Sequence, residues 1–136
     1  MAKRRGSRKI ALETLYEHDV SGRPSGEILD RHSADASFTY AATLVQGVGL
    51  HQTEIDELIS RYAEDWTLAR MPPIDRTLLR LGVLELVYLD VPAAVTINEA
   101  VDLAKQYSTA DSGRFVNGIL GRIGSSRWPR STTTAS

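Results

Sequence analysis

The chain has 136 residues and a mass of 15.0 kDa, enough for one domain with a single hydrophobic core. Its composition, 42% hydrophobic and 24% charged, is typical of soluble globular proteins, and no apolar run is long enough to cross a bilayer. The absence of cysteine excludes disulfides, thiolate metal sites and cysteine nucleophiles. The first ten residues lack the apolar segment of a secretory signal, so we expect a cytoplasmic protein.

The net charge of −1 hides an uneven distribution along the chain. Residues 1–10 contain five basic residues and no acid, and the residues after Asp111 contain four arginines and no acid. The stretch 11–111 carries all 17 acidic residues against seven basic ones. Basic ends suit a polyanion such as nucleic acid, whereas the acidic middle suits a basic protein partner or serves solubility alone.

The basic N-terminus leads into the first predicted helix. Apolar residues at helical spacing predict a helix over residues 8–20, with Ser7 as its cap. Residues 1–9 are predicted to begin as a flexible arm, whose arginine and lysine side chains can neutralise phosphates. Tyr16 either stacks on a base through an exposed ring or is a core tyrosine with its hydroxyl at the surface.

Three helices are predicted in the next third of the chain. Residues 25–32 are predicted to form a short helix. Apolar residues at helical spacing from Phe38 onward predict a second helix, in which Gly47 and Gly49 would allow a bend. The sequence from Thr53 to Asp56 resembles a helix cap and predicts a separate helix that runs to about residue 64. Trp66 then belongs to a linker that packs onto the core.

The stretch 74–89 is expected to be the central helix of the fold. Its apolar side chains point in nearly every direction around a helix, so protein must cover most of its circumference. Sixteen residues span roughly 24 Å, too short for a bilayer, and charged residues such as Asp75 interrupt the run. Glu85 among the leucines is either a charge at the rim of the core or a contact for a partner.

Two further helices complete the domain. The sequence from Thr96 to Glu99 fits a capping box and predicts a helix to Ser108. Asp111 or Ser112 is expected to cap the last helix, which runs to about residue 123. We therefore predict one all-helical domain over residues 10–124, with about seven helices, followed by a disordered tail at 125–136.

The sequence shows no arrangement of residues typical of catalysis. The three histidines lie in separate segments without metal-ligand spacing, and neither a phosphate-binding loop nor a dinucleotide fingerprint is present. The acidic residues have the pattern of solvated helix faces. We predict a binding protein rather than an enzyme, with no metal and no cofactor.

Four segments, in this order and within this length, resemble the NusB family of bacterial transcription antitermination factors. The resemblance covers almost the whole chain. The segments are Arg4–Leu12 with Leu15–Tyr16, Asp75–Leu86, Pro92–Val95 with Ile97–Lys105, and Phe115–Leu120.

The resemblance implies an all-α fold of about seven helices in two small bundles, with the stretch 74–89 buried at the centre. It also implies a function. NusB proteins pair with NusE, the ribosomal small-subunit protein also known as protein ten, and bind the single-stranded box A element of nascent ribosomal RNA. The complex joins elongating RNA polymerase with other Nus factors and suppresses premature termination.

The resemblance assigns residues to two surfaces. Glu85 matches a glutamate on the surface that faces NusE, which favours the partner contact over the rim charge. Gly6, Ser7 and Gly113 depart from the family pattern beside the RNA positions. The implied RNA-binding residues are Lys3, Arg4, Arg5, Arg8, Lys9, Tyr16, Asp111, Ser112, Arg114 and Phe115.

Two other functions are open. One is a helical adaptor that binds protein without RNA specificity. The other is an accessory domain related to the NusB-like part of ribosomal RNA cytosine methyltransferases, which would need a following catalytic domain that this sequence does not contain. The sequence does not decide between a monomer and a homodimer.

Overall fold

A computed structural model describes residues 4–126, and over that range the chain is all-α. A 3-10 turn at Asp30–His32 follows the second helix, another lies at Leu68–Arg70, and a π-helical turn at Leu84–Tyr88 continues the fourth. None of the helices in this range is long and apolar enough to span a membrane. The α-helices are α1 (Arg4–Ser21), α2 (Ser25–Leu29), α3 (Phe38–Ala63), α4 (Pro73–Val83), α5 (Ala93–Tyr107) and α6 (Ala110–Ser125).

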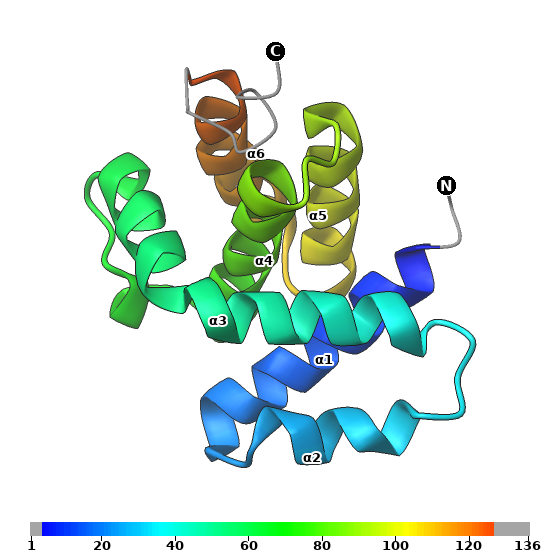
Figure 1. Cartoon of the computed structure of the whole chain (residues 1–136). Coiled ribbons are helices and arrows are strands. Elements are labelled where there is room, and N and C mark those ends of the chain that lie inside the picture. Colours follow the sequence, from blue (N-terminus) through cyan, green and yellow to red (C-terminus); the bar gives the residue numbers. More distant parts are fainter. Residues whose placement is uncertain (1–3, 127–136) are drawn as a thin grey trace.

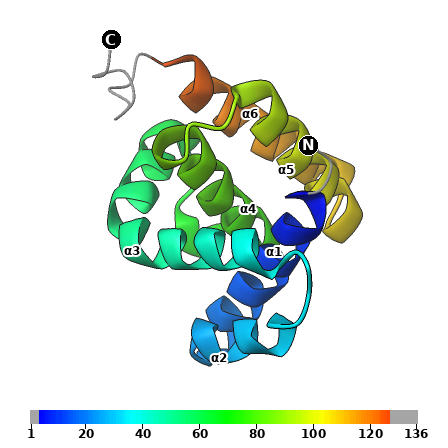
Figure 2. The ribbon, with the colours of Figure 1, turned by 45° about the vertical axis from the view of Figure 1, so that its right-hand side comes forward.

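Helix α4 lies at the centre of the arrangement (Figure 1). Helices α1, α2 and α3 form one group beside it, with α1 packed on both α2 and α3. Helices α5 and α6 pack on each other and on α4 at the other side, as the turned view shows (Figure 2). The all-helical fold with two small bundles around a central helix is therefore confirmed.

The central segment is buried because it is apolar all round. Pro72 and Pro73 begin α4, where the missing amide hydrogen of a proline costs nothing. The six residues from Leu81 to Leu86 are all buried. A Cβ built on Gly82 would lie 2.6 Å from Cδ1 of Leu120, so this glycine lets α6 approach α4 closely.

Replacing Gly82 by Val is expected to destabilise the protein by about 3 kcal/mol. The added methyl groups collide with Leu120, which is fully buried and has no space to move into, and overpacking of a tight core costs roughly 1–3 kcal/mol or more. Urea denaturation measures the change. Gly49→Val is the control, since a Cβ there meets nothing within 4 Å; equal destabilisation of both variants would contradict close packing at Gly82.

Helix α3 consists of two helical segments that meet at a kink, which confirms the two helices predicted between residues 38 and 64. His51, with the non-helical backbone angles φ −110° and ψ 17°, marks the kink two residues before the predicted cap at Thr53. The His51 ring stacks on Tyr88 of the π-helical turn at a centroid distance of 3.9 Å. The kink is therefore in contact with the central segment.

Helix starts also differ from the sequence-based expectation. Helix α1 begins at Arg4, so the prediction of a flexible arm is wrong for residues 4–9. The Ser7 hydroxyl is no cap: it donates to the Ser37 carbonyl at 2.8 Å. Helix α5 begins at Ala93, three residues before the predicted capping box. Residues 1–3 and 127–136, including Lys3 and nearly all of the predicted tail, lie outside the described residues.

Candidate nucleic-acid interface

Long polar side chains connect helix α1 to helix α5. Arg5 donates to Glu99 at 2.8 and 3.0 Å and to Asp102 at 3.1 Å. Two turns further along, the Tyr107 hydroxyl donates to Glu13 at 2.7 Å. The hydrogen bond from Arg5 lowers the pKa of Glu99, while burial and the bond to Glu13 raise the pKa of Tyr107 to about 12. These contacts fix which face of α1 is turned to solvent.

The second half of α1 also meets the start of α4. Arg76 donates to Asp19 at 2.7 Å, and its guanidinium donates to the carbonyls of Leu68 and Met71 in the preceding linker. The next position back, Asp75, faces the start of α6. The end of α1 and the first turns of α4 and α6 therefore converge on one side of the molecule.

Three of the predicted basic residues are accessible on α1. Arg4 is exposed and places its guanidinium 3.9 Å from the centre of the Tyr40 ring. Arg5 keeps about half of its side chain exposed despite its two acidic partners, and Lys9 is partly exposed. Tyr16, on the same helix, is 37% exposed, so its ring is neither a fully buried core side chain nor a free platform.

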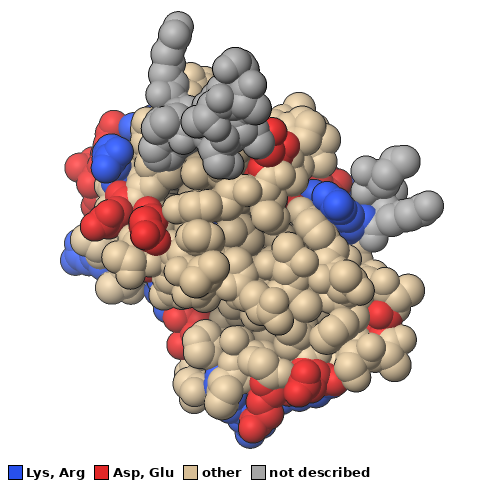
Figure 3. All heavy atoms as spheres, in the orientation of Figure 1, with Lys and Arg blue, Asp and Glu red and all other residues tan. Residues whose placement is uncertain are grey.

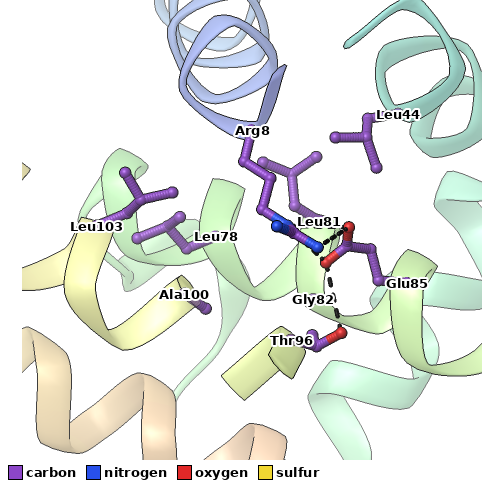
Figure 4. Close-up of a pocket in the computed structure, with 9 residues that line it drawn as sticks. All are labelled: Arg8, Leu44, Leu78, Leu81, Gly82, Glu85, Thr96, Ala100 and Leu103. Carbon is purple, nitrogen blue, oxygen red and sulfur yellow. Dashed lines mark hydrogen bonds and ion pairs between the residues drawn. The ribbon is translucent and has the colours of Figure 1, made fainter. Parts of the chain in front are cut away.

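Arg8 and Glu85 form a buried ion pair instead of surface contacts (Figure 4). Arg8 is 6% and Glu85 3% exposed, and the Arg8 Nε lies 3.1 and 3.0 Å from the two carboxylate oxygens. The Tyr40 hydroxyl donates to Glu85 at 2.6 Å and the Thr96 hydroxyl at 3.4 Å. The cavity beside the pair measures only about 10 Å³, which leaves no room for a ligand.

The structure thus buries Arg8 and Glu85, which the resemblance assigns to the RNA surface and to the surface that faces NusE. Neither side chain presents its charge to solvent, so neither contacts a ligand directly in this conformation. Their pair joins α1 to the central segment, and Tyr40 and Thr96 add α3 and α5. In the sequence Glu85 is a charged residue among leucines. Its partner, Arg8, is 77 positions away, and no local sequence pattern predicts such a pairing.

The start of α6 presents the other predicted residues. Thr109 caps the helix by accepting the Ser112 amide at 3.0 Å, in place of the predicted Asp111 or Ser112. Asp111 and Arg114 are strongly exposed and form an ion pair with each other. The Ser112 side chain is buried and bonds to Ser108 at 2.9 Å.

Phe115 forms one wall of a cleft that the sequence analysis did not anticipate. Its ring meets Trp66 edge to face, with centroids 5.9 Å apart, and Trp66 is 48% exposed. The cleft has a volume of about 350 Å³. It is lined by Trp66, Pro72, Asp75, Thr109, Asp111, Ser112 and Phe115.

Asp75 is the unexpected polar group of this cleft. It is 3% exposed, and its Oδ1 has no hydrogen-bond partner within residues 4–126. Burial raises the pKa of this carboxyl above its ordinary value of 3.8, and the hydroxyl of Ser112 opposes the shift. Local sequence patterns predicted only structural roles for Asp75 and Trp66, because long-range packing brings these two residues together.

Asp75→Asn is expected to stabilise the protein at neutral pH. Burial makes the pKa of Asp75 higher in the folded protein than in the unfolded chain. The wild-type protein is therefore most stable at a pH below the unfolded-state pKa, and it loses stability as the pH rises past that value toward the folded-state pKa. Thermal unfolding at about pH 3 should show little difference between variant and wild type, and at pH 7 a higher midpoint for the variant. A gain that is the same at both pH values would contradict this account.

Charge is sparse over much of one face of the molecule. On the face shown in Figure 3, basic and acidic atoms lie mainly around the edges, and one basic group lies near the N-terminal end of the chain. Much of the positive charge counted in the sequence is neutralised by neighbouring acids, as at Arg5, or buried, as at Arg8. The accessible positive charge on this side of the molecule is therefore smaller than the basic N-terminus suggested.

Comparisons with known proteins agree with one another. The family model described as "NusB family" matches residues 5–125. The transcription antitermination protein NusB of Salinispora arenicola is 49% identical over 130 residues, covering 90% of this chain and 96% of that protein. The NusB of a Nocardioides species is 50% identical over 127 residues, covering 90% and 94% of the two chains.

Solved structures share the fold. T. maritima NusB is 38% identical, with a TM-score of 0.82 and 93% of both chains covered. A chain in a crystal structure of antitermination factors NusB and NusE in complex with double-stranded RNA is 32% identical, with a TM-score of 0.83, covering 91% of this chain and 97% of that one. With the family model matching nearly all of the described residues, this chain belongs to the NusB family.

Proposed function

We propose that this chain is an RNA-binding transcription antitermination factor. It pairs with NusE, binds box A of nascent ribosomal RNA and suppresses premature termination by RNA polymerase in an elongation complex with other Nus factors. The observation that carries the proposal is the match, over about nine-tenths of the chain, to a structure that contains NusB and NusE with RNA. The relatives that share about half of its residues are named for antitermination.

The RNA is proposed to follow the accessible residues on α1 and at the start of α6. Arg4, Arg5 and Lys9 offer positive charge to phosphates, and Tyr16 offers part of a ring to a base. Lys3, just ahead of the described residues, would extend this row.

At the other end of this path, Arg114 and Phe115 offer a cation and an aromatic edge, with Asp111 and Ser112 beside them. Arg8 acts indirectly, because its ion pair with Glu85 holds α1 in position. The accessible cations are few, so the protein alone should bind RNA weakly at physiological salt.

NusE is proposed to supply the missing affinity. A basic ribosomal protein suits the acidic middle of this chain, and joint engagement of RNA by two linked proteins strengthens binding without any new contact to either. Glu85 would support that surface from within rather than touch the partner.

We propose a regulator without enzymatic activity that acts in the cytoplasm, where bacterial transcripts are made. Among residues 4–126 there is no group of three or more histidine, aspartate or glutamate side chains that could hold a metal ion. The His18 Nδ1 lies 2.6 Å from the Arg23 carbonyl, a local contact at the end of α1. Membership of the NusB family and the cleft beside Phe115 support a binding role for this chain.

In vitro transcription tests the function directly. The template carries a box A leader upstream of an intrinsic or factor-dependent terminator, and purified polymerase, NusE and the other Nus factors are present. Adding this protein should increase read-through on that template and not on one with a scrambled box A. NusE binding without any read-through would instead support the adaptor function.

A further inference from the structure

The cleft between α4 and α6 contains a polar group without a partner. Asp75 is one of the residues that line the cleft, and its Oδ1 atom is buried and accepts no hydrogen bond from residues 4–126. A buried acceptor left unpaired costs free energy, and folded proteins rarely retain one without a reason. A ligand that donates an N–H group to this oxygen would relieve the cost.

The walls of the cleft favour a flat, aromatic ligand. Trp66 and Phe115 both line it and meet edge to face; Trp66 is about half exposed and Phe115 is partly buried, so each ring leaves part of its surface for stacking. The volume of about 350 Å³ lies within the roughly 300–1,000 Å³ usual for small-ligand pockets. Hydroxyl groups of Thr109 and Ser112 add further polar contacts at one side.

The charges around the cleft exclude a phosphate from its interior and favour one outside. Asp75 and Asp111 both line it, and two carboxylates repel an anion. Arg114 forms an ion pair with Asp111, which lines the cleft, and most of the Arg114 side chain is exposed. A nucleotide could therefore place its base inside and its phosphate near Arg114.

We propose that this cleft holds one unstacked nucleobase of the bound RNA and that Asp75 Oδ1 accepts a hydrogen bond from the exocyclic amino group of that base. The inference rests on the proposed RNA-binding function and adds a specificity-determining residue to it. Adenine, cytosine and guanine carry such a group, whereas uracil does not. Carboxylates accept hydrogen bonds from base amino groups in other nucleic-acid readers.

The test combines protein variants with RNA analogues. Box A RNA is made with one base at a time replaced by its analogue without the amino group: inosine for guanosine, purine riboside for adenosine, pyrimidin-2-one riboside for cytidine. Fluorescence anisotropy with NusE present measures each affinity for wild-type protein and for Asp75→Asn. At one position the analogue should weaken wild-type binding roughly tenfold, as expected for loss of a hydrogen bond to a charged group, and should weaken binding by Asp75→Asn much less, because its neutral amide oxygen is a weaker acceptor.

Asp65→Asn is the matched control. Asp65 is an exposed acid close to Phe115 and Arg114, and its substitution removes the same charge without touching Asp75. If Asp75 acted only by repelling phosphate, both variants would bind every RNA more tightly by a similar factor and neither would change the discrimination at any position. That result would overturn the proposal.

A second readout does not depend on the Asn variant. Trp66 and Trp128 are the two tryptophans, so Trp128→Phe leaves Trp66 as the only one. Its fluorescence should be quenched by box A RNA and much less by the RNA that lacks the critical amino group. Asp75→Ala, which removes the acceptor, should abolish that difference.

The outcomes separate this inference from the proposed function. Wild-type binding to box A RNA with no position sensitive to amino-group removal would overturn the base-reading role and leave the function intact. Weakened NusE binding by Asp75→Asn, with RNA discrimination unchanged, would show that the cleft receives a protein group and would also overturn it. If the wild-type protein bound no RNA even in the presence of NusE, both the base-reading role and the proposed RNA-binding function would be overturned.

Discussion

Replacing Glu85 by Ala is expected to lower the free energy of unfolding by about 3–5 kcal/mol, the usual cost of breaking a buried ion pair. The substitution leaves the Arg8 guanidinium, 6% exposed, without its countercharge and removes the acceptor of the Tyr40 hydroxyl. Chemical denaturation monitored by circular dichroism measures the loss. Glu17→Ala is the control, because its partner Arg31 is half-exposed and a surface ion pair contributes little to stability.

The double variant Arg8→Met with Glu85→Leu separates the pair from its buried surroundings. Replacing both charges by apolar groups of similar size should recover most of the stability lost by Glu85→Ala, since the desolvation cost of both ions disappears. The same variant decides the role of Glu85 in partner binding. Retained affinity for NusE supports an indirect role, whereas full loss of NusE binding in this stable variant would restore the direct contact predicted from the resemblance.

The triple variant Arg4→Gln, Lys9→Gln, Arg114→Gln is expected to weaken box A binding on the order of 50-fold at about 0.15 M salt. Each phosphate contact with a single strand contributes about 0.7 to the dependence of affinity on salt, so three lost contacts should reduce that slope by about 2. Anisotropy titrations over a range of salt concentrations measure both quantities. Stability should change little, because all three side chains are at least partly exposed.

A second triple variant with the same change in net charge provides the comparison. Arg23, Arg31 and Arg61 are exposed and lie outside the proposed RNA path. Their replacement by Gln should alter affinity only slightly. Equal losses for the two triple variants would mean that the overall charge, and not the surface on α1 and α6, determines RNA binding.

The fold was largely predictable because helical periodicity and burial agree along most of the chain. The stretch 74–89 is buried on nearly all sides, as its apolar residues required, although its last turn is π-helical. Boundaries were less predictable. The serine and threonine residues that resembled caps at Ser7 and Thr96 use their hydroxyls for tertiary contacts instead, and residues 4–9 are helical, with Arg5 bonded to Glu99 of α5.

The candidate site was predictable only in part. The residues at the start of α6 and the accessible cations of α1 followed from local sequence and from resemblance. Local sequence carries no information on which charges become paired, so Arg8 and Glu85 were assigned to surfaces although they neutralise each other inside. Asp75 and Trp66 were missed for the same reason: the cleft exists only once α4, α6 and the linker between α3 and α4 are packed together.

The most direct test of the account is the affinity of this protein for box A RNA, measured by fluorescence anisotropy with and without its cognate NusE and against a scrambled RNA of the same composition. The account predicts weak binding of both RNAs by the protein alone and a selective gain for box A when NusE is added. Equal affinity for both RNAs in the presence of NusE, or no binding of either, would contradict it.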